Sequence, residues 1–172
     1  MDRGRFLQAG AAAAAALSAS SCRSSQERWR FVTDAEGRTL GALCDQIVPP
    51  AEYPGAAQTG AVEFIDRQLM RHYRKHRAAY RRGLAETDQL GIATFGHAVA
   101  SLGFAQQTGI VPVLEGQRRP FFDLVLNHTM QSFYGSPRHG GNRDAAGWRM
   151  LGVPEPPVRG RSQFDGAGKR PS

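Results

Sequence analysis

Cysteine is scarce in this sequence, and the motifs that bind nucleotides or build a hydrolase site are missing. Two cysteines among 172 residues cannot supply the four thiolates of an iron–sulfur cluster. There is no Gly-x-Gly-x-x-Gly pattern after an expected strand and no nucleophile elbow, which argues against a dinucleotide-binding fold and a serine hydrolase. The histidines are scattered along the chain: His72, His76, His97, His128 and His139. We therefore expect no catalytic set, cofactor site or metal site in this chain.

Signals for β-structure and for nucleic-acid binding are also lacking. Alternation of apolar and polar residues is too short to predict a strand, apart from a weak case at residues 110–114. The formal net charge is +7. No zinc-finger spacing, RNA-binding aromatic pattern or helix-turn-helix accompanies this charge, so we expect no nucleic-acid partner.

Positive charge is concentrated in one stretch, residues 67–82. Its basic residues are Arg67, Arg71, His72, Arg74, Lys75, His76, Arg77, Arg81 and Arg82. One interpretation is a contact with an acidic partner or with anionic lipid headgroups, and the other is a solvated helix face. His72 and His76 have a spacing that can bind a metal on one helix face. The surrounding cations disfavour a divalent ion there.

Residues 1–22 have the pattern of an export signal. The segment begins with the basic residues Arg3 and Arg5, continues with a mildly apolar run and ends with small residues. The start resembles a twin-arginine leader, except that Gly4 stands where the second arginine belongs. This segment predicts a periplasmic location.

Cys22 ends this leader after three small residues, as the acylated cysteine of a lipoprotein does, and is a candidate lipid anchor. A disulfide with Cys44 is the alternative in an oxidising compartment, and acylation would preclude it. Cys44 falls inside an expected helix and is interpreted as a small buried apolar residue. Residues 23–32 have the composition of a polar linker.

Helical spacing of apolar residues dominates the remainder and predicts an all-α fold. We expect a single small helical domain of about five helices over residues 33–154. Thr33 and Glu36 have capping-box spacing at the first helix start. The expected helices cover residues 33–48, 59–76, 78–90 with a break near Gly91, 104–115, and the stretch from Pro120 to Gly135.

Two details of these helices can be tested against the structure. In the helix at 104–115 the side chains expected to face inward are Phe104, Ile110, Val111 and Leu114, and Pro112 should kink the helix or mark its start. The last helix is apolar on most of its circumference, with Met130 in its second apolar stripe, which predicts burial against several neighbours. His128 in this helix is interpreted as a hydrogen-bonded core histidine rather than a ligand.

A Gly/Pro/aromatic-rich C-terminal loop should follow the last helix. Its stretch 138–142 can adopt backbone angles closed to most residues. Tyr134 and Trp148 are expected to pin the loop by burying their rings while keeping a polar tip available. Residues 155–172 are rich in Pro, Gly and charge and predict a disordered tail.

The loop also resembles the C-terminal signature of the gluconate 2-dehydrogenase subunit 3 family. The signature joins an aromatic-proline turn, two glycines with an asparagine, a tryptophan and a Gly-x-Pro ending. The matching residues are Phe133-Tyr134, Ser136-Pro137, His139-Gly140-Gly141-Asn142, Trp148 and Gly152-Val153-Pro154. In weaker form the resemblance runs from residue 33 to 154.

The resemblance implies a non-catalytic small subunit that binds a large flavoprotein dehydrogenase for export, stability and assembly. FAD, with haem or an iron–sulfur cluster, would then belong to partner subunits, one of them a cytochrome c, and membrane association would come through a partner or a lipid. The residues implied in partner binding are Phe133, Tyr134, Pro137, His139, Gly140, Gly141, Asn142 and Trp148. The alternative is a stand-alone exported lipoprotein that binds an anionic ligand or membrane surface through its basic helix.

Overall fold

The computed structural model describes residues 29–153, and in this range the regular elements are helices, with no strand. The all-α prediction is therefore confirmed for these residues. The expected export signal at 1–22, the lipid anchor Cys22, the first part of the linker and the tail at 155–172 lie outside the described residues.

Six α-helices and four short 3-10 helices make up the described part of the chain. The α-helices are α2 (Asp34–Ile47), α3 (Ala61–Leu69), α4 (Arg77–Phe95), α5 (Phe104–Gln117), α6 (Arg119–Tyr134) and α7 (Ala146–Met150). The 3-10 helices are η1 (Arg74–His76), η2 (Val99–Ser101), η3 (Pro137–His139) and η4 (Arg143–Ala145).

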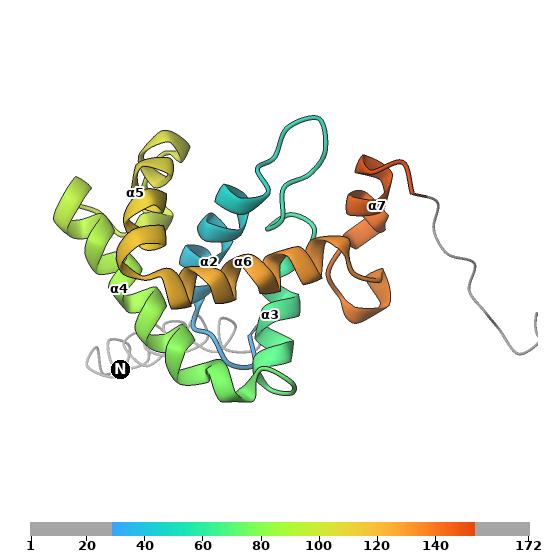
Figure 1. Ribbon diagram of the computed structural model, residues 1–172, viewed down its shortest axis with the longest axis horizontal. Helices are drawn as coiled ribbons and strands as arrows, with labels where there is room; N and C mark the ends of the chain where they lie inside the picture. The colour runs from blue at the N-terminus through green and yellow to red at the C-terminus, as the bar shows by residue number, and fades with distance from the viewer. Residues whose placement is uncertain (1–28, 154–172) are drawn as a thin grey trace, which may run out of the picture.

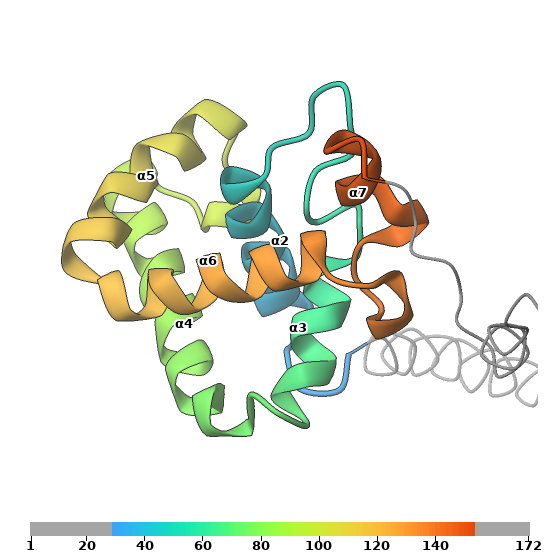
Figure 2. The same ribbon diagram turned by 45° about the vertical axis from the view of Figure 1, so that its right-hand side comes forward.

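Helix α6 lies at the centre of the arrangement and contacts the other five α-helices. In both ribbon views α4 and α5 lie towards one end of α6, and α3 and α7 towards the other (Figures 1 and 2). Helix α2 packs against α6 between these two ends. A helix in this position must be apolar on several faces, as the sequence predicted. Its buried residues are Phe121, Phe122, Val125, His128, Thr129, Ser132 and Phe133.

The first helix boundary follows its sequence signals closely. The backbone N–H of Glu36 donates to Thr33 Oγ1 at 3.2 Å, and the backbone N–H of Thr33 donates to Glu36 Oε2 at 2.7 Å. This reciprocal pairing satisfies two donors at the start of α2. The helix ends at Ile47, just before the two prolines, because proline lacks the N–H that a further turn needs. The capping-box prediction is confirmed.

The predicted helix at 59–76 is wrong in its second half. Helix α3 ends at Leu69, and the chain turns before η1 and α4 begin. The turn is held by the Tyr73 N–H, which donates to the Gln68 carbonyl at 2.8 Å, and by Arg77 Nε, which donates to the Leu69 carbonyl at 2.7 Å. It places Tyr73 against α6, where its ring stacks on His128. The sequence keeps helical spacing of apolar residues beyond Leu69. The packing of Tyr73 against α6 nevertheless requires a turn, so α3 ends at Leu69.

Three further expectations are corrected at α4 and α5. Helix α4 continues through Gly91 and ends at Phe95, and the residue after it, Gly96, has a left-handed φ of 80°. Gly91 is needed for packing, because an added Cβ there would lie 2.8 Å from the His97 carbonyl oxygen. Phe104 faces solvent with half of its surface exposed, since it begins α5. The weak strand signal at 110–114 falls inside α5. Pro112 also lies inside this helix and so does not mark its start.

Cys44 is buried and free, as the sequence predicted. Its Sγ lies 3.3 Å from Thr129 Oγ1 on α6. Burial raises the pKa of this thiol to about 12, so it stays protonated and behaves as a small apolar group.

Asp66 fixes the start of the described chain to α3. Its buried carboxylate accepts backbone N–H groups from Arg30 at 2.8 Å, Phe31 at 2.8 Å and Val32 at 3.0 Å. A buried carboxylate is tolerated when several donors surround it. The segment before α2 is thereby part of the folded core.

His128 is the hydrogen-bonded core histidine that the sequence predicted. Its Nδ1 lies 2.8 Å from the Tyr80 hydroxyl, and its ring stacks on Tyr73 with centroids 3.6 Å apart. Burial, and then the charge of nearby His76, lower the pKa of His128 to about 4.

No helix within residues 29–153 is long and apolar enough to cross a membrane.

The lowered pKa of His128 predicts a loss of stability in mild acid. Between about pH 6.5 and pH 4 the unfolded chain binds a proton that the folded chain does not, so the free energy of unfolding falls as pH drops through this window. We expect a loss of about 2–3 kcal/mol between pH 7 and pH 4.5 that His128→Gln lacks. Urea unfolding of both proteins at the two pH values measures it. An equal loss in both proteins would refute this assignment.

Candidate functional site

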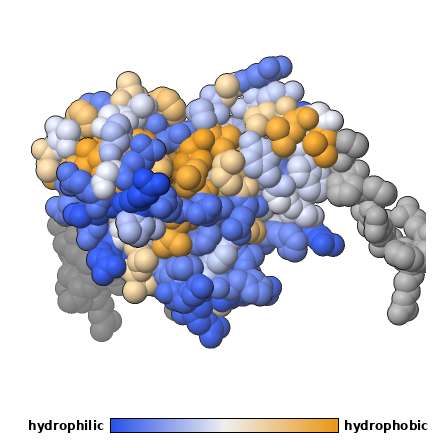
Figure 3. Space-filling model, in the orientation of Figure 1, coloured by the Kyte–Doolittle hydropathy of each residue, from blue (hydrophilic) through white to orange (hydrophobic). Residues whose placement is uncertain are grey.

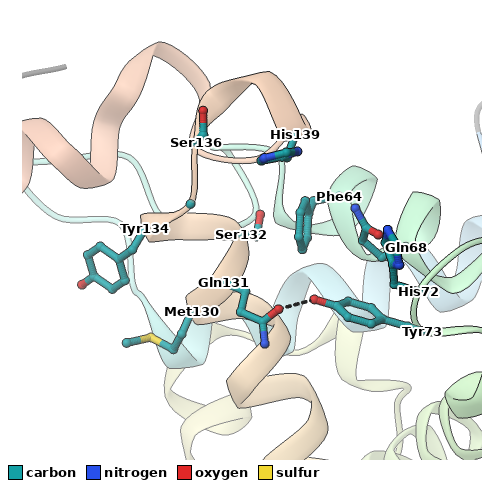
Figure 4. A pocket seen from close by; sticks show the side chains of 11 residues that line it. Phe64, Gln68, His72, Tyr73, Met130, Gln131, Ser132, Tyr134, Ser136 and His139 are labelled. Atoms are coloured by element: carbon teal, nitrogen blue, oxygen red, sulfur yellow. Dashed lines mark hydrogen bonds between the residues drawn. The ribbon is translucent and has the colours of Figure 1, made fainter. Parts of the chain in front are cut away.

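An open pocket lies where α3, the turn after it, α6 and the C-terminal segment meet (Figure 4). The C-terminal segment is defined here as residues 135–153. The pocket has a volume of about 610 Å³. It is lined by Phe64, Gln68, His72, Tyr73, Met130, Gln131, Ser132, Tyr134, Gly135, Ser136 and His139.

The walls of the pocket combine aromatic rings with polar groups. The rings of Phe64 and Tyr73 meet edge to face with centroids 6.3 Å apart. The Tyr73 hydroxyl donates to Gln131 Oε1, which holds the turn against α6. Gln68 Oε1 and Ser132 Oγ are buried and have no hydrogen-bond partner among residues 29–153. The pocket therefore offers apolar contact area, while these two unpaired atoms are themselves closed to solvent.

Asn142 shapes the C-terminal segment from inside. Its side chain is fully buried. Its Nδ2 donates to the Gly135 carbonyl at the end of α6, and its Oδ1 accepts the Gly147 N–H at the start of α7, both at 2.8 Å. One amide thus joins the two ends of the loop. Asn142 has a left-handed φ of 49°, a conformation that asparagine tolerates better than most residues.

The glycines of the segment permit close backbone contacts with α6. An added Cβ at Gly141 would lie 2.1 Å from Ser132 Oγ, and one at Gly147 would lie 2.2 Å from the Phe133 carbonyl oxygen. Trp148 adds a further link, because its Nε1–H donates to the Tyr134 carbonyl at 2.8 Å. The polar tip of this tryptophan is therefore used within the chain rather than left available.

A second set of contacts joins the segment to α3. The backbone N–H of Arg143 donates to the Thr59 carbonyl at 3.0 Å, and Arg143 Nη2 lies 3.0 Å from Glu63 Oε1. The Arg67 guanidinium lies against Gly140, whose left-handed φ of 93° favours glycine at that position. The segment is a folded cap with η3, η4 and α7 in it, where the sequence analysis expected a loop without helix.

The predicted partner-binding residues therefore fall into three groups. Phe133, Gly141 and Asn142 are buried inside the chain, and their contacts there are internal. Four more are partly buried: Tyr134, Pro137, Gly140 and Trp148. His139 is exposed, and with Tyr134 it lines the pocket.

Sequence reasoning missed the part of the pocket that α3 and α6 provide. Phe64, Gln68 and Ser132 carried no motif. Met130 belongs to an apolar stripe expected to be buried, yet 38% of its surface is exposed at the pocket. The only available signal was that α6 has more apolar faces than its neighbours can cover.

The basic residues at 67–82 do not form one uniform surface. Arg67 lies on Gly140, while Arg77 and Arg81 lie over the Phe31 ring at 5.4 Å and 4.3 Å from its centroid. Arg81 also pairs with Glu36. By contrast, Arg71 and Lys75 are exposed and make no ion pair within the described part of the chain. Some basic side chains of this stretch therefore make contacts within the chain, and others are exposed to solvent.

No group of three or more His, Cys, Asp or Glu side chains suited to a metal ion occurs within residues 29–153.

Comparison with known proteins identifies the family. The family model described as gluconate 2-dehydrogenase subunit 3 matches residues 34–154. The chain therefore belongs to this family, which suggests a subunit of a gluconate 2-dehydrogenase complex. No curated protein and no solved structure matches the chain.

The role of Asn142 can be measured by replacing its amide. Asn142→Ala removes two hydrogen bonds and leaves the buried Gly147 N–H without its partner, so we expect a loss of about 2–4 kcal/mol in the free energy of unfolding. Asn127→Ala is the matched control, because the exposed Asn127 makes one side-chain bond to the Asp123 carbonyl. It should cost less than about 0.5 kcal/mol. Equal losses in the two variants would contradict the structural role of Asn142.

Proposed function

We propose that this chain is the non-catalytic small subunit of a periplasmic FAD-dependent sugar or sugar-acid dehydrogenase, of the gluconate 2-dehydrogenase type, and that it binds the flavoprotein subunit. The observation that carries the proposal is the family match over residues 34–154, which includes every α-helix in the described part of the chain. Binding would support the export, stability and assembly of the complex.

The pocket and its surroundings supply a surface suited to this role. Met130 and the partly buried Tyr134 lie at the pocket. The end of α7 adds exposed apolar side chains at Met150, Leu151 and Val153. Figure 3 shows an apolar patch at the α7 end of the molecule and others over the middle and the opposite end of this face. Aromatic and methionine side chains are enriched in protein interfaces, and exposed apolar patches mark them.

The remaining parts of the proposal concern the partners. FAD, with haem or an iron–sulfur cluster, is assigned to other subunits, including a cytochrome c. Membrane association is assigned to a partner or to a lipid on Cys22. The leader at 1–22 would direct export, and its pattern is the support for the periplasmic location.

The alternative function, binding of an anionic surface through the basic helix, has less support. It requires a continuous charged face over residues 67–82. Arg67, Arg77 and Arg81 are instead used in contacts with the rest of the chain. The remaining free cations suit a local contact better than attachment to a membrane.

Co-purification tests the proposed function. Tagged wild-type chain, produced with the flavoprotein subunit of its own source, should elute as a yellow complex with a flavin spectrum. Met130→Glu places a charge in the contact and should weaken the complex at least about 30-fold, since burying an unpaired charge costs several kcal/mol. Ile92→Glu is the control, because Ile92 is exposed on α4 outside the pocket, and it should retain the flavoprotein.

Recovery of a colourless wild-type chain from cells that make the flavoprotein would contradict the proposal. Equal loss of complex in both variants would show that the pocket is not the contact.

A further inference from the structure

The turn between α3 and α4, residues 70–76, carries positive charge that the fold does not neutralise. Its exposed basic side chains are Arg71, His72, Arg74 and Lys75. The sequence has no Asp or Glu from residue 67 to residue 85. Asp66, just before this stretch, is buried and accepts three backbone N–H groups. No ion pair within residues 29–153 involves a residue of the turn.

The turn is held in place, so these charges have fixed positions on the surface. The Tyr73 ring stacks on His128 with centroids 3.6 Å apart, and the Tyr73 hydroxyl donates to Gln131 on α6. Arg77 Nε donates to the Leu69 carbonyl at 2.7 Å. In Figures 1 and 2 the turn lies at the lower end of the molecule, below α6. A partner that contacts these cations therefore has little backbone left to order.

The fold itself gains little from this group of cations. Like charges held close together repel each other and lower the stability of the compact state. Arg81, farther along the same basic stretch, pairs with Glu36. By contrast, the side chains of Arg71 and Lys75 make neither an ion pair nor a hydrogen bond within the described part of the chain. A contact outside the chain explains their positions better than stability does.

We propose that this turn contacts an acidic patch on the surface of the flavoprotein subunit and accelerates the association of the two subunits. Carboxylates of the patch face Arg71 and Lys75. This inference rests on the proposed function and adds to it the charge of the partner surface.

Three observations favour a protein surface over a membrane as the partner of the turn. The family match suggests a subunit of a complex, so another subunit is the available partner. The turn supplies His72 and Tyr73 to the pocket, so its cations border the proposed contact. Basic segments that attach to anionic lipid carry about four to eight Lys or Arg residues together. The turn carries three.

Association kinetics with the purified flavoprotein subunit test the inference. At about 50 mM salt the association rate constant should fall about fivefold in Arg71→Gln/Lys75→Gln and about 30-fold in Arg71→Glu/Lys75→Glu, because charges at the edge of a contact act mainly on the encounter. The dissociation rate constant should change less than about twofold. At about 1 M salt the Debye length is only about 3 Å, so both variants should associate as fast as the wild type.

The matched controls are Arg38→Gln/Arg119→Gln and Arg38→Glu/Arg119→Glu, which change the net charge by the same amounts. Both positions are exposed and lie outside the pocket. Arg119 forms only an exposed pair with Asp123, which contributes little to stability. The controls should associate within about twofold of the wild-type rate. All free variants should keep the wild-type melting temperature, which separates an effect on association from an effect on folding.

The outcomes distinguish this inference from the proposed function. If the wild-type chain binds the flavoprotein and the turn variants associate equally fast, the inference is overturned while the subunit role stands. An equal decrease in the turn variants and in their controls would also overturn it, because net charge alone would then account for the rates. If the wild-type chain binds no flavoprotein, both proposals fail.

Vesicles of phosphatidylglycerol and phosphatidylcholine test the lipid alternative. We expect the wild-type chain and Arg71→Glu/Lys75→Glu to bind these vesicles equally weakly. Binding by the wild-type chain that this variant loses, with an unchanged rate of association with the flavoprotein, would show that the turn contacts lipid and would overturn the inference.

Discussion

The side-chain amide of Asn142 is the contact on which the shape of the candidate site depends. It ties the last carbonyl of the α6 end to the first turn of α7, and it does so from a fully buried position. The backbone around it takes left-handed angles at Asn142, Asp144 and Ala145, which are unfavourable for residues other than glycine. The segment holds this conformation because the amide and the Trp148 indole bond it to α6, and Arg143 bonds it to α3. Without these bonds the third wall of the pocket would not exist.

Asn142 and Ser132 are both buried, but they differ in whether their polar atoms are hydrogen-bonded within the described part of the chain. The Nδ2 and Oδ1 atoms of Asn142 are both hydrogen-bonded within the chain. Ser132 is equally buried but its hydroxyl is unused. The signature residue Asn142 therefore holds the C-terminal segment in place beside the pocket.

Local sequence patterns predicted much of the fold, but they did not predict the pocket. The Thr33 and Glu36 pair set the start of α2, two prolines set its end, and the apolar faces of α6 predicted its central position, because each of these effects acts within a few residues. The turn at Tyr73 could not be predicted, since it depends on stacking against His128, 55 positions away in the sequence. Gly91 was expected to break a helix but instead admits the backbone near Val99. The pocket itself joins two helices and a cap, and no local pattern encodes where such elements meet.

The carboxylate of Asp66 has a consequence for the way the chain enters the domain. Three successive backbone amides, from Arg30 to Val32, are bound to one side chain of α3. The point at which the chain joins the helical domain is therefore fixed on α3. A peptide bond broken upstream of Arg30 would leave these three hydrogen bonds intact.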